Sequence, residues 1–146
     1  MSEFSTPEND KLIADVYARA LEARAANMAL GPAEQIVYEV EMLTQEVNSG
    51  VSFEQYFRWA SLEELAKVVE RLQALNLSGV ADIARRAFAV AFPDGLPASS
   101  GTMDELTQWS PEQLEQLAAL ADEFVEFNGT ITNALAAFYR SRRGEV

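Results

Sequence analysis

Apolar residues recur every three or four positions along most of this chain. Ile36, Val40, Leu43 and Val47 are separated by four, three and four positions, so they share one face of a helix with 3.6 residues per turn. No segment shows the sustained apolar–polar alternation of a half-buried β-strand. The pattern predicts an all-α fold, a compact single-domain bundle of about seven to eight helices.

Capping signals divide this pattern into separate helices. Thr6 precedes Pro7, and Ser61 precedes Glu64 by three positions, which are the signatures of a helix cap and of a capping box. Thr130 is expected to cap the last helix in the same way. The one long loop is expected over residues 93–101, followed by C-terminal helices over 102–143. Because the apolar pattern is alike on both sides of this loop, residues 1–146 are predicted to form a single helical domain.

The residue types that the chain lacks exclude several chemistries. It contains no cysteine and no histidine, which excludes disulfides, thiolate nucleophiles, zinc sites with these ligands and His-based triads. Adjacent carboxylates such as Glu63 and Glu64 point about 100° apart on a helix, so they do not form a shared-proton pair. We therefore expect no enzymatic activity, no catalytic residue, no cofactor and no metal site.

The net charge is −12, from 23 acidic and 11 basic residues. Such a surface repels nucleic acids and anionic membranes and attracts basic partners. No basic residue lies between Arg24 and Arg58 or between Arg86 and Arg140. The candidate partner-binding acids are Glu34, Glu41, Asp104, Glu105, Glu112, Glu115, Asp122 and Glu126. The alternative is that these acids only solvate the outer faces of helices and keep the protein soluble.

Three of these acids are predicted to form one stripe. Glu115, Asp122 and Glu126 fall within about 40° of one another at 100° per residue, with steps of about 10 Å and 6 Å along the helix. Each strand of duplex DNA carries one phosphate per about 3.4 Å. A single stripe is therefore sparser than DNA, and two or three stripes or two subunits are needed to imitate it.

The chain is expected to be cytoplasmic. No apolar run approaches the roughly 20 residues of a membrane span, so no membrane association is expected. The first residues show no basic region followed by an apolar one, so no secretory signal is visible. The absence of cysteine fits a reducing compartment.

The stretch from Glu46 to Trp59 is unusually dense in aromatic and turn-forming residues. A helix from about Pro32 to Asn48 is expected to stop where Asn48 or Gly50 takes a left-handed conformation, before a short helix from Phe53 to Trp59. Three rings are expected in the core and Gln55 in a hydrogen bond. The residues of this signature are Asn48, Gly50, Phe53, Gln55, Tyr56 and Phe57.

This order of residues resembles the Glu-Val-Asn-Asn-Gly-Gly-Phe-x-Gln-Tyr-Phe signature of the DMP-type DNA-mimic family of small acidic bacterial proteins. The likeness covers about residues 32–97 and is weaker in the C-terminal helices. The chain departs from the signature at Ser49, Val51 and Ser52, and at Arg58-Trp59-Ala60.

The resemblance implies an all-helical protein that forms a homodimer. It also implies an acidic protein-binding module, a DNA mimic that occludes a basic DNA-binding protein such as a transcription regulator without binding nucleic acid itself. A small structural or interaction domain, whose acidity serves only solubility, is the alternative. An enzyme built on carboxylates and arginines is the weakest hypothesis, because no motif supports it.

Overall fold

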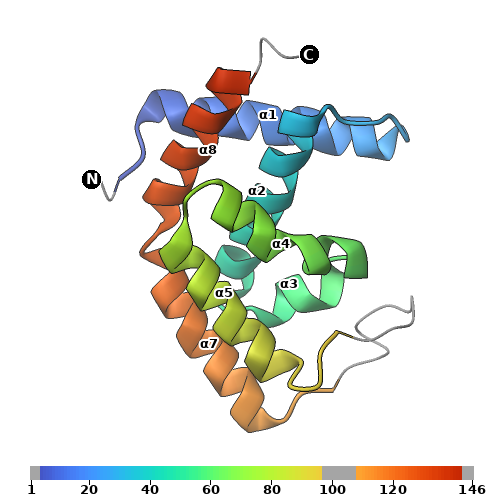
Figure 1. Cartoon of the computed structure of the whole chain (residues 1–146), viewed down its shortest axis with the longest axis vertical. Helices are drawn as coiled ribbons and strands as arrows, with labels where there is room; N and C mark the ends of the chain where they lie inside the picture. The colour runs from blue at the N-terminus through green and yellow to red at the C-terminus, as the bar shows by residue number, and fades with distance from the viewer. Residues whose placement is uncertain (1–3, 97–107, 143–146) are drawn as a thin grey trace.

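The computed structural model describes residues 4–96 and 108–142. Within these residues the chain forms seven α-helices and no β-strand (Figure 1), which confirms the predicted all-α fold. The helices are α1 (Pro7–Ala25), α2 (Pro32–Gly50), α3 (Glu54–Trp59), α4 (Leu62–Ala74), α5 (Ser78–Ala91), α7 (Pro111–Val125) and α8 (Asn128–Arg142). One hydrophobic cluster contains side chains from all seven.

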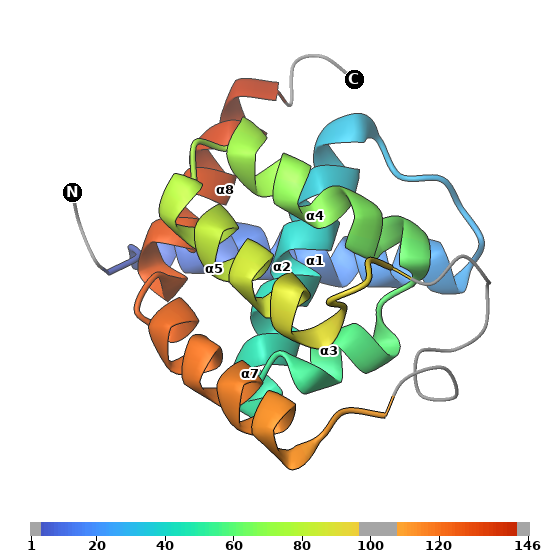
Figure 2. The same cartoon turned by 60° about the horizontal axis from the view of Figure 1, so that its bottom comes forward.

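Helix α2 is the central element of the fold. It contacts α1, α3, α4, α7 and α8, and Figure 2 shows it passing through the middle of the molecule. Side chains on more than one of its faces are buried as a result, including Val37, Val40 and Val47, each with 0% exposure. Tyr38 and Glu41 lie outside the apolar face of Ile36, Val40, Leu43 and Val47, yet neighbouring helices leave them only 6% and 7% exposed.

Aromatic rings fill the space between α3, α5 and the start of α7. The Phe57 ring lies 5.1 Å from the ring of Phe88, 5.3 Å from that of Phe92 and 6.3 Å from that of Trp109, measured between centroids. Phe53 packs edge-on against Phe124 at 5.6 Å. The prediction that Phe53, Tyr56 and Phe57 are core residues is confirmed by exposures of 1%, 1% and 0%.

Most of the predicted helix starts are confirmed by their hydrogen bonds. The Asn9 amide donates to the Thr6 hydroxyl oxygen, and Ser61 with Glu64 forms a reciprocal capping box. The prediction that Thr130 caps the last helix is wrong, because α8 already begins at Asn128. The helix expected to start at 102 and most of the loop expected over 93–101 lie outside the described residues.

The end of α2 differs from the prediction. Val51, rather than Asn48 or Gly50, takes the left-handed conformation, with φ 51° and ψ 36°. Asn48 stays inside the helix, where its side chain donates to the Thr44 carbonyl oxygen at 2.7 Å. Gly50 packs closely on α3, because a Cβ there would lie 3.2 Å from the side chain of Gln55, a tight contact. The glycine of the signature therefore permits close packing of α3 on α2.

We expect Val51→Gly to raise the free energy of unfolding by about 1 kcal/mol. A left-handed backbone costs an L-residue roughly 1–2 kcal/mol, and a β-branched residue is among the least suited to it. The Val51 side chain is 58% exposed, so its removal exposes little buried apolar surface. The greater conformational freedom of glycine in the unfolded chain offsets part of the gain in stability. Urea denaturation of Val51→Gly and the control Val51→Ala tests this, and equal stability of the two variants would contradict it.

Candidate functional site

The outer face of α7 carries a row of exposed carboxylates. Glu112, Glu115 and Asp122 lie on this face and Glu126 follows the last turn, while Phe124 on the opposite side is fully buried. None of these four acids forms an ion pair with any residue in 4–96 or 108–142. The predicted stripe of Glu115, Asp122 and Glu126 is thus solvent-exposed and available to a partner.

Glu123, on the same helix, is engaged within the molecule. Both of its carboxylate oxygens accept from the Arg86 guanidinium, at 3.0 and 3.2 Å. Arg86 also donates to Asp82 at 3.2 Å. This cluster links α5 to α7. Arg86 is its one cation, so it compensates the charge of one of the two carboxylates.

The row of acids on α7 continues towards the first turn of α1. Glu126 lines a shallow hollow together with Phe4 and Ser5, and the Ser5 hydroxyl donates to a carboxylate oxygen of Asp10. Figure 1 shows the start of α1 and the junction of α7 with α8 on the same side of the molecule. We call the set of Asp10, Glu112, Glu115, Asp122 and Glu126 the acidic band.

The other predicted acids do not join the band. Glu34 is half-buried, and its carboxylate accepts the Gly31 amide at 3.3 Å, which stabilises the start of α2. Glu41 is buried, so its assignment as a surface acid is wrong. Asp104 and Glu105 lie outside the described residues.

The family signature holds helices together. Gln55 donates from Nε2 to the Glu46 carboxylate at 2.6 Å, which confirms the predicted hydrogen bond and fixes α3 on α2. Asn48 and Asn128 exchange two side-chain hydrogen bonds at 2.7 and 3.1 Å, which join α2 to the first residue of α8. These contacts give the signature a scaffolding role.

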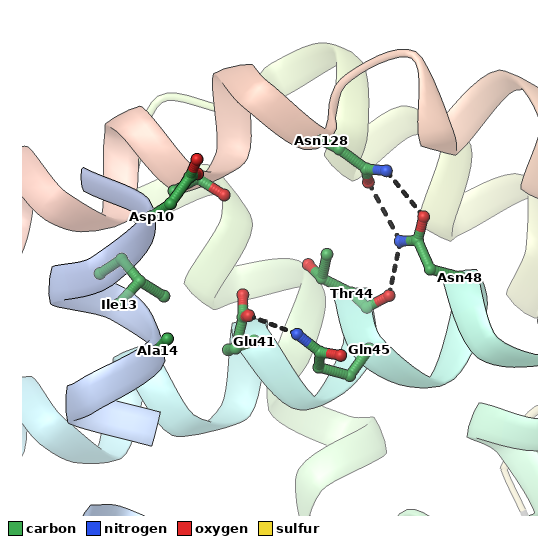
Figure 3. Close-up of a pocket in the computed structure, with 9 residues that line it drawn as sticks. Asp10, Ile13, Ala14, Glu41, Thr44, Gln45, Asn48 and Asn128 are labelled. Carbon is green, nitrogen blue, oxygen red and sulfur yellow. Dashed lines mark hydrogen bonds between the residues drawn. The ribbon is translucent and has the colours of Figure 1, made fainter. Parts of the chain in front are cut away.

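Glu41 faces a cavity of about 300 Å³ between α1, α2 and α8 (Figure 3). Its Oε2 accepts from the Gln45 side chain at 2.8 Å, whereas its Oε1 is buried and has no hydrogen-bond partner among the described residues. Burial, and secondarily the charge of Asp10, raises the pKa of the Glu41 carboxyl, against the opposing effect of the Gln45 hydrogen bond. The cavity wall consists of Asp10, Ile13, Ala14, Glu41, Thr44, Gln45, Asn48, Asn128 and Thr132.

We expect Glu41→Gln to stabilise the protein at neutral pH by about 1 kcal/mol, since a buried carboxylate with no ion pair and one unsatisfied oxygen is costly. A carboxyl whose folded pKa is raised binds its proton more tightly in the folded state. The wild type therefore loses stability as pH rises from the ordinary pKa through the folded one. The advantage of the variant should vanish below that window, as urea denaturation from pH 4 to pH 8 will show. An equal advantage at every pH would contradict this account.

Sequence reasoning missed two features of the site. Asp10 was not singled out, because the position of its hydrogen-bond partner Ser5 beside Glu126 depends on the tertiary fold. The burial of Glu39 and Glu41 was also missed, although apolar residues on several faces of α2 are a signal of a buried helix. Glu39 is compensated by Arg71, 32 positions away, through two hydrogen bonds of 3.4 Å.

The remaining site classes find no support in the described part of the chain. No group of three or more acidic, histidine or cysteine side chains in 4–96 and 108–142 is arranged to hold a metal ion. None of the helices in the same ranges is long and apolar enough to cross a bilayer.

Comparison with known proteins identifies the family. No curated protein and no solved structure matches the chain. The family model described as DMP19-like protein matches residues 28–142. This match includes the C-terminal helices, so it extends well beyond the signature region around α2 and α3. The chain belongs to the DMP19-like protein family.

Proposed function

We propose that this protein is a DNA mimic whose acidic band binds the basic surface of a DNA-binding protein and prevents it from binding DNA. The observation that carries the proposal is the alignment of exposed carboxylates on α7 that have no intramolecular cation among the described residues. Membership of a family named for a DNA mimic protein supports it, as does the net charge of −12.

The dimensions of the band bear on how it would engage such a partner. Glu115, Asp122 and Glu126 span about 16 Å along α7, a length over which one strand of DNA carries about five phosphates. Asp10 and Glu112 bring the band to five carboxylates. A homodimer would present two such bands, and we infer that two copies act together on a partner.

The proposed partner surface is rich in lysine and arginine. Exposed ion pairs contribute little affinity individually but raise the association rate collectively, and salt screens them. A cytoplasmic, bacterial DNA-binding regulator or nucleoid protein has the required chemistry. The mimic itself would not bind nucleic acid, because its charge repels phosphates.

The salt dependence of partner binding tests the proposal. Affinity capture at low salt should retain a basic DNA-binding protein, which is then purified and titrated. We expect its dissociation constant to rise about tenfold or more between roughly 50 and 200 mM salt. Capture of no DNA-binding protein, or a dissociation constant independent of salt, would reject the proposal and favour an interaction domain whose acidity serves only solubility.

A further inference from the structure

The cavity beside Glu41 shares only Asp10 with the acidic band. Figure 3 shows the Glu41 carboxylate directed from α2 into the space between Asp10 and Asn128. Glu41 is 7% exposed, and its Oε1 has no partner within residues 4–96 and 108–142. A buried carboxylate oxygen with no donor is costly, and it is usually satisfied by a bound group or by water.

The wall of the cavity specifies the chemistry of that group. Glu41 and Asp10 supply two carboxylates, and no basic side chain lines the cavity among the described residues. Thr44, Asn48 and Asn128 add short polar side chains. The hydroxyl of Thr44 already donates to the Val40 carbonyl, the Gln45 amide donates to Glu41 Oε2, and Asn48 and Asn128 bond each other, so these hydrogen bonds leave Glu41 Oε1 without a donor. The site therefore calls for a cation that carries hydrogen-bond donors.

A primary ammonium satisfies this requirement better than the alternatives. It carries three donors on a slender alkyl stem, so it can reach a recessed oxygen. Calcium takes six to eight oxygen ligands, and magnesium an octahedral set with several waters, whereas no group of three or more acidic side chains in the described residues is arranged to hold a metal ion. The volume of about 300 Å³ lies at the small end of ligand sites, which suits a molecule of few heavy atoms.

We propose that the cavity between α1, α2 and α8 binds the primary ammonium group of a small alkylamine, with Glu41 Oε1 accepting one N–H and Asp10 supplying a second negative charge at the rim. The same head group also occurs on a lysine side chain. The proposal does not depend on the DNA-mimic function, because amine binding is measured on the protein alone.

Titration of the full chain with 1,4-diaminobutane, followed by calorimetry and by NMR shifts at pH 8, tests the site. We expect saturable binding that is weakened about tenfold or more in Glu41→Gln, since a hydrogen bond to a charged group contributes at least that factor. Glu115→Gln, which removes the same charge from the exposed face of α7, should bind as the wild type does. Tetramethylammonium, which has no N–H donor, should not bind.

A second variant and a second probe complete the experiment. Ala14 lines the cavity from an exposed position on α1, so Ala14→Met should obstruct the cavity and abolish binding while every charge remains. A Gly-Lys-Gly amide serves as the lysine probe: binding tighter than that of the diamine assigns the ammonium to a protein side chain, and weaker binding assigns it to a free amine. Absence of saturable binding by either probe, or equal responses in Glu41→Gln, Glu115→Gln and the wild type, would overturn the proposal.

Discussion

Replacing Phe57 with alanine is expected to lower the free energy of unfolding by about 4 kcal/mol, within the range of buried phenylalanine truncations. Phe57 has no exposed surface, and its ring contacts five others, those of Phe53, Tyr56, Phe88, Phe92 and Trp109. The cavity left by the ring is enclosed by α3, α5 and the start of α7, so collapse around it is restricted. Such a loss is a large fraction of the stability of a domain of this size.

Chemical denaturation of the Phe57→Ala variant measures this effect, and Trp59→Ala is the matched control. Trp59 is the last residue of the same helix but is 69% exposed, so its removal should change the stability by no more than about 0.5 kcal/mol. Similar losses in the two variants would show that the aromatic cluster does not hold α3 in place.

Reversing the charges of Glu115, Asp122 and Glu126 to lysine is expected to weaken binding of the basic partner about a hundredfold. Each reversal replaces an attraction by a repulsion at the same position, and like charges facing each other across an interface cost several kcal/mol. The three residues are exposed and unpaired among the described residues, so folding should be unaffected. Titration of the partner at low salt, with circular dichroism to verify the helix content, measures the effect.

A second triple variant separates position from net charge. Glu22→Lys, Glu63→Lys and Glu70→Lys together change the net charge by the same amount at exposed positions on α1 and α4. This control should retain most of the affinity, because its substitutions lie outside the acidic band. Equal weakening in both triple variants would show that only the net charge matters.

The relation between sequence and structure differs between the scaffold and the site. Helical spacing and caps depend on residues within one or two turns, so the all-α fold, the Ser61–Glu64 capping box and the core positions of Phe53, Tyr56 and Phe57 were predictable. The left-handed conformation of Val51 was not predictable. The preference of glycine for that conformation suggested Gly50, whereas Gly50 is the last residue of α2 and packs against Gln55.

The positions of the acidic residues were likewise predictable only where they depend on a single helix. The exposed stripe on α7 follows from periodicity alone, because only one side of that helix is apolar. For α2, periodicity gave the wrong environment for Glu41, since a helix surrounded by five others buries polar positions too. The position of Ser5 beside Glu126, and the cavity beside Glu41, depend on how the tertiary fold brings the start of the chain, α2 and α8 together. No local sequence pattern encodes that arrangement.

The most direct test of the central claim is a competition experiment with DNA. The captured DNA-binding protein is placed on a fluorescent duplex, and wild-type protein is added at increasing concentration while the anisotropy of the duplex is followed. If the acidic band occupies the DNA-binding surface, the duplex is released in proportion to the added protein, and the triple lysine variant on α7 releases none at the same concentrations. A ternary complex in which the partner holds the duplex and the wild-type protein together would contradict mimicry.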